Sequence, residues 1–232
     1  MSSLTSPQNA SASQLKDPSQ GFVQAAPAQQ GRPSYHHGDL RQALLVAAKQ
    51  LIAEAGIENL SLRRLAERAG VSRTAPYHHF SDKNDLLCAI AAEGFRRRHQ
   101  MATLGFDDPA KTMLEKFEDY VLGYIQFAVD SPEEYELMFG RSIWKQQNST
   151  RELRDVAYPC FQHQVDMVRG WQACGLIAGD NPLRTSQVIW GALHGMAKLL
   201  IDGIYTDSAQ IEEMSRCAIK LFVNNSAYPI DK

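Results

Sequence analysis

One run of the 232-residue chain decides the fold: Ser61-Leu62-Arg63-Arg64-Leu65-Ala66-Glu67-Arg68-Ala69-Gly70-Val71-Ser72. Ser61 is a good helix N-cap, and the apolar residues after it recur on one helical face: Leu62, Leu65, Ala66 and Ala69. Gly70 is expected to end this helix in the left-handed conformation that a short turn requires. Ser72 is expected to cap a second short helix that extends to about His79. Two short helices joined by a tight turn predict a helix-turn-helix.

The second helix of such a unit lies in the major groove of DNA, with its first residues at the base edges. Here Arg73 can contact guanine through two hydrogen bonds, Thr74 can bond a base edge or touch a thymine methyl, and Pro76 offers an apolar surface. Tyr77 and His78 follow on the same helix. These residue types suit sequence readout, although two packed core helices would show the same apolar spacing.

Other polar groups suit the phosphate backbone. The N–H groups of the helix that Ser61 opens favour an anion, and Lys83 stands at the start of a later helix. Arg32 lies in a flexible Gly31-Arg32-Pro33 segment and can reach an adjacent minor groove. The predicted DNA contacts are therefore Arg32, Ser61, Ser72, Arg73, Thr74, Pro76, Tyr77, His78 and Lys83.

Outside this motif the chain reads as a polar tail followed by helices. Residues 1–34 hold 7 Ser, 6 Gln, 5 Ala and 4 Pro, a composition that cannot offset its ordering entropy and predicts disorder. A first helix is expected over 39–55 with Asp39 as its N-cap, and a fourth from Ser81 or Asp82 past Arg98. Longer helices are expected at 109–129, 132–140, 149–174, 182–202 and 207–224. The predicted fold is all-α, with about nine helices.

Composition and charge limit the function classes. Hydrophobic residues make up 44% of the chain and the net charge is −2, which excludes a purely disordered chain and a uniformly basic nucleic-acid coat protein. Residues 31–100 hold 11 Lys or Arg against 7 Asp or Glu, whereas residues 101–232 hold 12 against 18. A basic segment joined to an acidic one suggests a nucleic-acid reader with a second domain of another purpose.

Targeting and cysteine patterns favour a cytoplasmic protein. No apolar run is long enough for a membrane span, and the N-terminus lacks the pattern of a secretory signal. The four cysteines form neither a disulfide framework nor a zinc pattern, and we expect core thiols: Cys88, Cys160, Cys174 and Cys217. The pairs His36-His37 and His78-His79 lack a third ligand at metal spacing, so we expect no metal, and no cofactor motif is present.

Further segments flank the decisive run at characteristic spacing. They are Asp39-Leu40-Arg41, Tyr77-His78-His79-Phe80 and Ser81-Asp82-Lys83-Asn84-Asp85-Leu86-Leu87. Together with that run they resemble the DNA-binding domain of the tetracycline-repressor (TetR) family. In the C-terminal half, Tyr135-Glu136-Leu137-Met138-Phe139-Gly140 and Trp190-Gly191-Ala192-Leu193-His194-Gly195 resemble the branch whose ligand domain carries a Trp-x-x-x-His-Gly signature. That branch also tends to begin with a lead-in such as Tyr35-His36-His37-Gly38-Asp39-Leu40.

The resemblance implies an all-α homodimer that binds a palindromic operator, usually as a repressor. It implies a DNA-binding domain over 35–95, with the motif at about 60–79, and an effector-binding and dimerisation domain over 96–227. The family's dimers form from the last two long helices, here 182–202 and 207–224. A small-molecule effector is expected to move the fourth helix and to spoil the spacing of the two recognition helices.

The sequence does not identify the effector. Aromatic residues at helical spacing can surround an apolar ligand but are also typical of plain core, and a buried histidine is compatible with either. The candidates for an effector site are Tyr124, Phe139, Arg141, Trp190 and His194. The run Arg96-Arg97-Arg98 reads as a solvated face more than as a phosphate contact.

Two other function classes stay open, an all-helical enzyme and a protein-binding adaptor. The sequence shows no Gly-x-Ser-x-Gly elbow, phosphate-cradling glycine loop, His-Glu-x-x-His or dinucleotide fingerprint. We therefore expect that the protein is not an enzyme. Both alternatives leave the cationic segment 72–79 unexplained.

Overall fold

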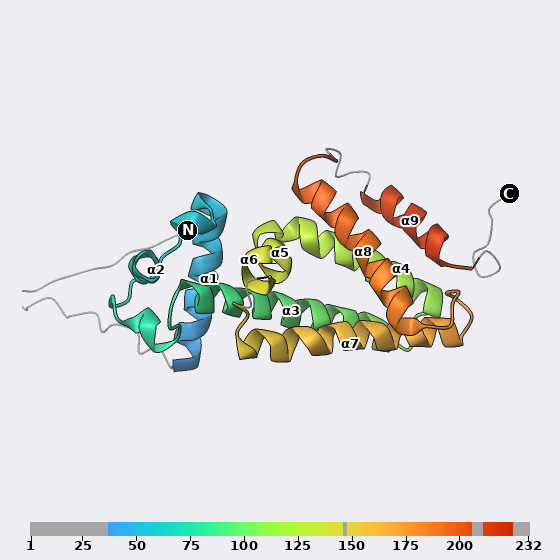
Figure 1. The fold of residues 1–232 in the computed structure, drawn as a ribbon, viewed down its shortest axis with the longest axis horizontal. Helices are drawn as coiled ribbons and strands as arrows, with labels where there is room; N and C mark the ends of the chain where they lie inside the picture. Colours follow the sequence, from blue (N-terminus) through green and yellow to red (C-terminus); the bar gives the residue numbers. More distant parts are fainter. Residues whose placement is uncertain (1–36, 146–147, 206–210, 225–232) are drawn as a thin grey trace, which may run out of the picture. The chain divides into compact units, whose positions relative to one another are not determined.

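The computed structural model describes residues 37–145, 148–205 and 211–224, and these are almost entirely helical (Figure 1). The elements in chain order are α1 (His37–Ala55), η1 (Ile57–Asn59), α2 (Leu62–Ala69), η2 (Ala75–His78), α3 (Lys83–Asp107), α4 (Met113–Asp130), α5 (Pro132–Phe139), α6 (Arg141–Trp144), α7 (Arg151–Ala173), α8 (Pro182–Ile201) and α9 (Ile211–Phe222), where η marks a 3-10 helix. Within the described ranges no strand occurs, and the extended pairing seen is an isolated bridge between Ile177 and Val223. The predicted all-α class is confirmed.

The first helix of the helix-turn-helix forms as the sequence indicates. The Ser61 Oγ accepts a hydrogen bond from the Arg64 backbone N–H at 3.3 Å and caps α2. Gly70 follows α2 with φ 67°, in the left-handed region where glycine has no Cβ penalty. The Val71 N–H then donates to the Ala66 carbonyl at 3.1 Å. Local signals therefore fix α2 at both ends.

The second helix of the motif differs from the prediction. The helical segment is Ala75–His78, and it is the 3-10 helix η2 instead of an α-helix that starts after Ser72. Pro76 explains the difference, because it has no N–H to donate to the Ser72 carbonyl and its ring crowds that carbonyl. The carbonyl accepts the Ala75 N–H instead, at 3.0 Å. The Ser72 hydroxyl lies 3.2 Å from the Thr74 hydroxyl, so Ser72 is not the predicted side-chain cap.

Helix α3 runs without a break from the helix-turn-helix into the C-terminal helices (Figure 1). Asp82 is its N-cap, since the Asp82 carboxylate accepts the Asp85 N–H at 2.8 Å. Ser81, the other predicted cap, donates its N–H and its hydroxyl to the Asp85 carboxylate. α3 contacts α1 as well as α4, α5 and α7. One helix is therefore shared by the two domains expected at 35–95 and 96–227.

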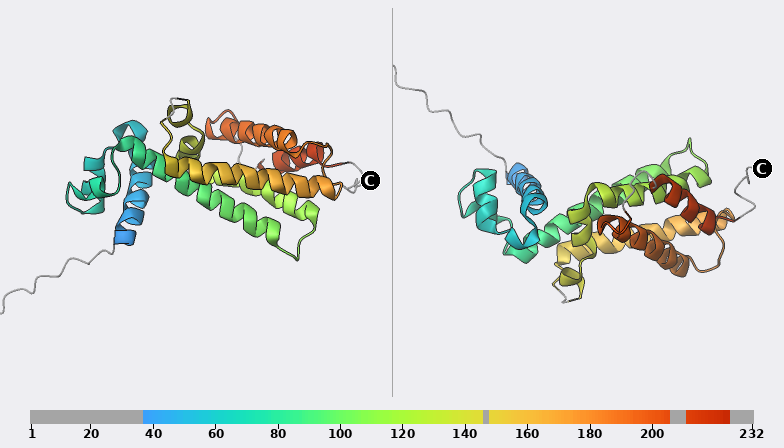
Figure 2. Two further views of the ribbon diagram at one scale, coloured as in Figure 1. Left: turned by 60° about the horizontal axis from the view of Figure 1, so that its bottom comes forward. Right: turned by 90° about the horizontal axis from the view of Figure 1, so that it is seen from above.

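The C-terminal helices pack on one another around buried aromatic side chains. α7 lies along α3, α8 contacts α4 and α7, and α9 contacts α4 (Figure 2). α4 begins at Met113 and not near 109, because Thr112 and Glu115 form a capping box. A further short helix, α6, interrupts the loop that the sequence indicated after Gly140. The predicted long helices otherwise have counterparts among the described elements.

Helix α5 lies directly on α3 at Gly94. A Cβ atom there would lie 2.6 Å from the Met138 Sδ and 3.0 Å from the Glu134 Cγ, closer than packed side-chain atoms come. Gly94 therefore permits the close approach of α5 to α3. This approach fixes α5 at a position where it also contacts α1 and α4.

The cysteines and the hydropathy of the helices bear on two expectations from the sequence. Cys88 is buried and Cys160 is half-buried, but Cys174 and Cys217 are exposed, so the expectation of core thiols holds for the first two and is wrong for the last two. None of the helices described has both the length and the hydropathy that a membrane crossing requires.

Candidate functional site

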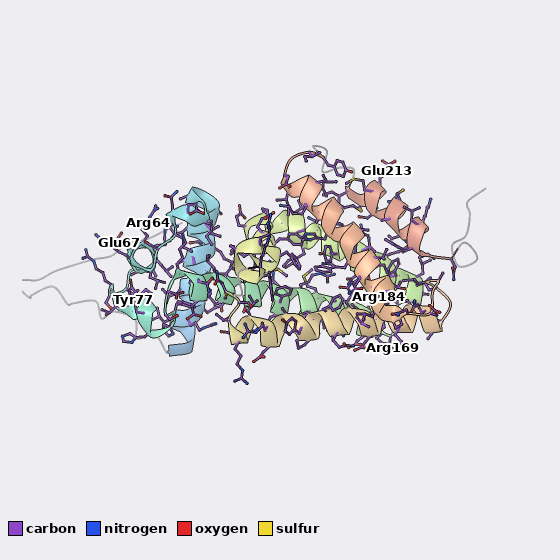
Figure 3. All side chains as sticks on the ribbon, viewed as in Figure 1. Arg64, Glu67, Tyr77, Arg169, Arg184 and Glu213 are labelled. Carbon is purple, nitrogen blue, oxygen red and sulfur yellow. The ribbon has the colours of Figure 1, made fainter. Side chains whose placement is uncertain are left out.

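The segment between α2 and α3 exposes most of the residues predicted to read DNA. Arg73, Thr74 and His78 are exposed, and Tyr77 is 57% exposed. The Arg73 guanidinium makes no hydrogen bond or ion pair with any residue that the structure describes. In Figure 3, Tyr77 and Arg64 lie around α2 and η2, away from α4–α9. The motif thus presents a polar, cationic surface to solvent.

Two other arginines of the motif are engaged within the protein. Arg68 on α2 pairs with Glu54 of α1, with Nη1 2.9 Å from Oε1. The Arg64 Nη1 donates to the Asn59 carbonyl at 2.9 Å. These contacts tie α2 to α1 and η1. Arg73, by contrast, keeps all its N–H donors for an acceptor outside the described residues.

Ser61 and Lys83, the predicted phosphate contacts, stand at helix starts. The Ser61 Oγ is engaged as the cap of α2. The Lys83 Nζ donates to the Glu58 carbonyl at 3.3 Å, and the residue is half-exposed. Because an ammonium group has three donors, Lys83 keeps further donors for a phosphate.

Pro76 does not fit its predicted role as a DNA contact. The structure buries it within the motif, so its ring is not part of the exposed surface. Arg32, the segment 1–34 and His36 lie outside the described residues, and so does the side chain of His37. Across the ranges that are described, no three His, Cys, Asp or Glu side chains gather closely enough to hold a metal ion.

Four of the five predicted effector-site residues lie together among α4, α5 and α8. The Trp190 Nε1 donates to the Tyr124 hydroxyl at 2.9 Å, and that hydroxyl lies 2.8 Å from the Tyr135 hydroxyl. The Tyr135 hydroxyl lies 2.7 Å from the His194 Nδ1. The Phe139 ring packs on the His194 and Trp190 rings, with centroids 5.1 and 5.7 Å away. We call these five residues the tyrosine–histidine cluster.

Two residues of this region differ from the sequence prediction. Arg141, the fifth candidate, is exposed on α6 and makes no hydrogen bond or ring contact with the cluster. Tyr135, which was not a candidate, is buried and links Tyr124 to His194. Tyr135 therefore takes a central position in the cluster.

Burial keeps the cluster uncharged near neutral pH. Burial raises the pKa of Tyr124 and of Tyr135 well above the ordinary tyrosine value. Burial also lowers the pKa of His194, and the positive charge of Lys198 lowers it further, while Glu136 opposes both effects. The cluster therefore consists of neutral hydroxyl, imidazole and indole groups that are hydrogen-bonded to one another.

A buried carboxylate on α5 joins three helices. Glu134 is 4% exposed, and its Oε2 lies 2.5 Å from the Arg97 Nη2 of α3. Its Oε1 lies 3.4 Å from the Lys49 Nζ of α1. Arg97 also donates to the Ser131 Oγ at 2.9 Å. These side chains border an open cavity of about 280 Å³ between α1 and the start of α5. No sequence signal singled out Glu134, because acidic residues in a first helical turn are common.

The run 96–98 is not the solvated face that the sequence indicated. Arg96 pairs with Glu152 of α7 at 2.7 Å, and Arg97 pairs with Glu134 of α5. The Arg98 guanidinium lies over two tyrosine rings of α4. All three arginines are thus engaged by the C-terminal helices.

Comparison with known proteins places both parts of the chain in one family. Residues 44–90 match "Bacterial regulatory proteins, tetR family", and residues 117–222 match "Tetracyclin repressor-like, C-terminal domain". The HTH-type transcriptional repressor Rv1474c of Mycobacterium tuberculosis is 37% identical over 197 residues, which cover 82% of this chain and 94% of that protein.

Other relatives match over shorter stretches or in structure. The HTH-type transcriptional repressor AcnR of Corynebacterium glutamicum is 40% identical over 81 residues, 34% of this chain, and the chain spans only 43% of that repressor's length. A solved protein of unknown function from Rhodococcus sp. RHA1 is 29% identical, with a TM-score of 0.70 over 83% of this chain and 100% of that one. Because both segments match and one relative aligns over nearly its whole length, this chain belongs to the TetR family of bacterial regulatory proteins.

Proposed function

We propose that the protein is a sequence-specific DNA-binding transcriptional regulator that represses genes in the cytoplasm. The observation that carries this proposal is Arg73, which follows the α2 turn, is exposed and has no partner among the residues that the structure describes. An arginine in this setting can bind the two acceptors of a guanine in the major groove. Thr74, Tyr77 and His78 are exposed beside it and extend the reading surface. The relatives described as transcriptional repressors support the same function.

Phosphate contacts are proposed at the border of this surface. The N-terminus of α2, which Ser61 opens, provides backbone N–H groups to a phosphate, and Lys83 provides a charge. Ser72 adds an exposed hydroxyl. Arg32 precedes α1 by a few residues and is proposed to reach a neighbouring minor groove. Pro76 is left out of the proposal because it is buried.

A twofold dimer is proposed to place two such surfaces on one operator. α8 exposes Val188 to 65% together with Gly191 and Ala192, which share its face at i, i+3 and i+4 spacing. α9 exposes Leu221 to 80%. Exposed apolar residues on two adjacent helices are typical of a subunit interface. Such a dimer would read a palindrome whose half-sites lie about one DNA turn apart.

A small-molecule effector is proposed to bind at the tyrosine–histidine cluster and to release the repressor from DNA. Helix α5 supplies a physical connection, because Tyr135 belongs to the cluster and the adjacent Glu134 contacts Lys49 of α1. A ligand that displaces Tyr135 would shift α5 and thus the support of α1. The effector needs only to favour the DNA-incompetent arrangement by a few kcal/mol.

Selection of bound sites from random duplexes tests the proposed function. We expect an enriched palindrome, an affinity gap of about 10³ or more over random duplex, and a steep loss of affinity with salt. Binding that is absent or insensitive to salt would favour a protein-binding adaptor instead. The symmetry of the selected site also reports whether the protein binds as a dimer.

A further inference from the structure

Arg98 of α3 has no counter-ion among the residues that the structure describes. The Arg98 guanidinium lies 4.8 and 5.1 Å from the ring centroids of Tyr120 and Tyr124. Its Nε is buried without a hydrogen-bond partner, and no carboxylate in the described ranges pairs with it. The rings of Tyr120 and Tyr124, together with the Tyr120 hydroxyl, are thus the main compensation for this charge.

The preceding two arginines show the contrast on the same helix. Arg96 pairs with Glu152, and Arg97 pairs with Glu134. Arg98 is half-buried, and a charge partly withdrawn from water without an opposite charge costs free energy. Of the three arginines, Arg98 is therefore the one that can still pair with an anion, because no described carboxylate pairs with it.

Arg98 borders a small cavity whose charge is positive. The cavity holds about 60 Å³ and is lined also by Lys116, Asp119 and Tyr120. The Asp119 carboxylate is already paired with Lys111 at 2.6 Å. The Lys116 Nζ lies 5.6 Å from the Phe106 ring centroid and has no ion pair among the described residues. Two cations without an ion pair among the described residues therefore line a cavity whose carboxylate is already paired.

A second buried donor without an acceptor lies beside the same aromatic rings. Trp171 is fully buried, and its Nε1 has no hydrogen-bond partner among the described residues. Its ring lies 5.7 Å from that of Phe106 and 5.5 Å from that of Tyr120, both of which line the cavity. Buried donors are normally paired, so this unpaired indole N–H adds a second unsatisfied donor beside the aromatic rings that line the cavity.

We infer that this cavity binds the carboxylate group of a small organic acid, which Arg98 holds through its paired N–H donors. A volume of about 60 Å³ is several times the roughly 10–15 Å³ that one water needs, enough for a carboxylate head but not for a large drug. The planar guanidinium matches a carboxylate with two parallel hydrogen bonds. Lys116 adds a second charge at the same cavity.

This inference rests on the proposed function and extends its effector site, since the cavity would hold the carboxylate of an effector whose remainder reaches the tyrosine–histidine cluster. Arg98 contacts Tyr124, a member of the tyrosine–histidine cluster, whose hydroxyl lies next to that of Tyr135. A carboxylate that draws the guanidinium away from Tyr124 would change the packing of that ring. The change would then reach Tyr135 and α5, the helix that contacts α1.

Calorimetric titration of the full chain tests the ligand class. The probes are acetate, propionate and butyrate against acetamide, propionamide and butyramide, with inorganic phosphate as a second anion, all at equal ionic strength. We expect saturable binding of at least one carboxylate and at least tenfold weaker binding of its amide and of phosphate. Equal binding of acid and amide, tighter binding of phosphate, or no binding of any acid would overturn the inference.

Variants then locate the site. We expect Arg98→Gln to weaken carboxylate binding at least tenfold and Lys116→Gln to weaken it severalfold. Arg169→Gln, which changes an exposed arginine paired with Asp166 on α7, should leave it unchanged. If Arg98→Gln does not fold, the comparison of acid with amide on the wild-type chain still decides the ligand class. Operator binding is measured separately, so that a chain that binds its operator but no acid refutes only this inference.

Discussion

Glu134 and Tyr135 are consecutive residues of α5, yet they contact different parts of the molecule. Glu134 holds Lys49 of α1 and Arg97 of α3. Tyr135 lies between the Tyr124 hydroxyl and the His194 imidazole. α5 is short and packs closely on α3. Because α5 is short and the two residues are consecutive, we expect a displacement at Tyr135 to disturb the Glu134 contacts as well.

Removal of the Glu134 charge is therefore expected to loosen α1. Glu134→Gln should lower the free energy of unfolding by about 1–3 kcal/mol, because Lys49 and Arg97 lose a charged, buried acceptor. Amides of α1 should also exchange hydrogen faster. Urea unfolding and hydrogen exchange measure the two effects. Glu133→Gln, which changes the exposed neighbour, should stay within about 0.5 kcal/mol, and equal effects of the two variants would contradict the role of Glu134.

The depressed pKa of His194 predicts a stability that falls in mild acid. Because burial lowers the pKa in the folded state below the ordinary value near 6.5, the folded protein favours the neutral imidazole. Its contribution is complete above the unfolded-state pKa and is lost as the pH falls through the folded-state pKa. Thermal unfolding between pH 8 and pH 5 measures this loss.

His194→Gln should flatten that pH dependence without abolishing it. Burial lowers the pKa of His163 as well, and the nearby His99 adds to the effect, so His163 contributes with the same sign. His163→Gln is the matched comparison. Identical pH profiles for the wild type and both variants would show that neither imidazole is held neutral by the fold.

Local signals explain why the helix-turn-helix was predictable. Ser61 and Gly70 act through their own backbone neighbours, and both behave as the sequence indicates. Pro76 shows the limit of such reasoning. Its effect depends on which carbonyl it faces in the preceding turn, and the outcome is a 3-10 helix with a buried proline in place of an exposed α-helix.

The C-terminal site was predictable only in part, for a related reason. Trp190 and His194 are one helical turn apart, so the helical period alone places them together. Glu134 and Arg98 gain their roles from contacts with other helices, and the absence of a side chain at Gly94 leaves room for Glu134 and Met138 of α5. The sequence of the run 96–98 does not show that side chains of α4, α5 and α7 will contact its three arginines.

The proposed dimer interface predicts a variant that changes assembly but not folding. Val188→Glu should convert the dimer to a monomer, because it places a charge in the centre of the apolar face of α8. Since Val188 is exposed in the single chain, the unfolding free energy of the monomer should hardly change. Leu104→Glu, on an exposed residue of α3, is the control. Sedimentation velocity measures both, and a dimeric Val188→Glu variant would place the interface elsewhere.

The phosphate role of Lys83 predicts a uniform loss of affinity. Lys83→Ala should weaken operator and random duplex alike and should reduce the slope of log affinity against log salt by about one unit. The variant makes one phosphate contact fewer, so its binding to either duplex releases about one counterion fewer. Titrations at several salt concentrations measure the slope. An unchanged slope would mean that Lys83 serves only its hydrogen bond to the Glu58 carbonyl.

The exposed guanidinium of Arg73 predicts a different pattern, in which the protein discriminates less between its operator and random duplex. Arg73→Ala should cost about 1–3 kcal/mol on the operator and relax one base position, with little change on random duplex. Fluorescence anisotropy with both duplexes at one salt concentration measures the difference, and Arg169→Ala on α7 controls for net charge. Equal losses on both duplexes would mean that Arg73 contacts phosphate. Because Arg73 has no partner in the described residues, its removal leaves no unpaired group behind, and the measured cost reports the DNA contact itself.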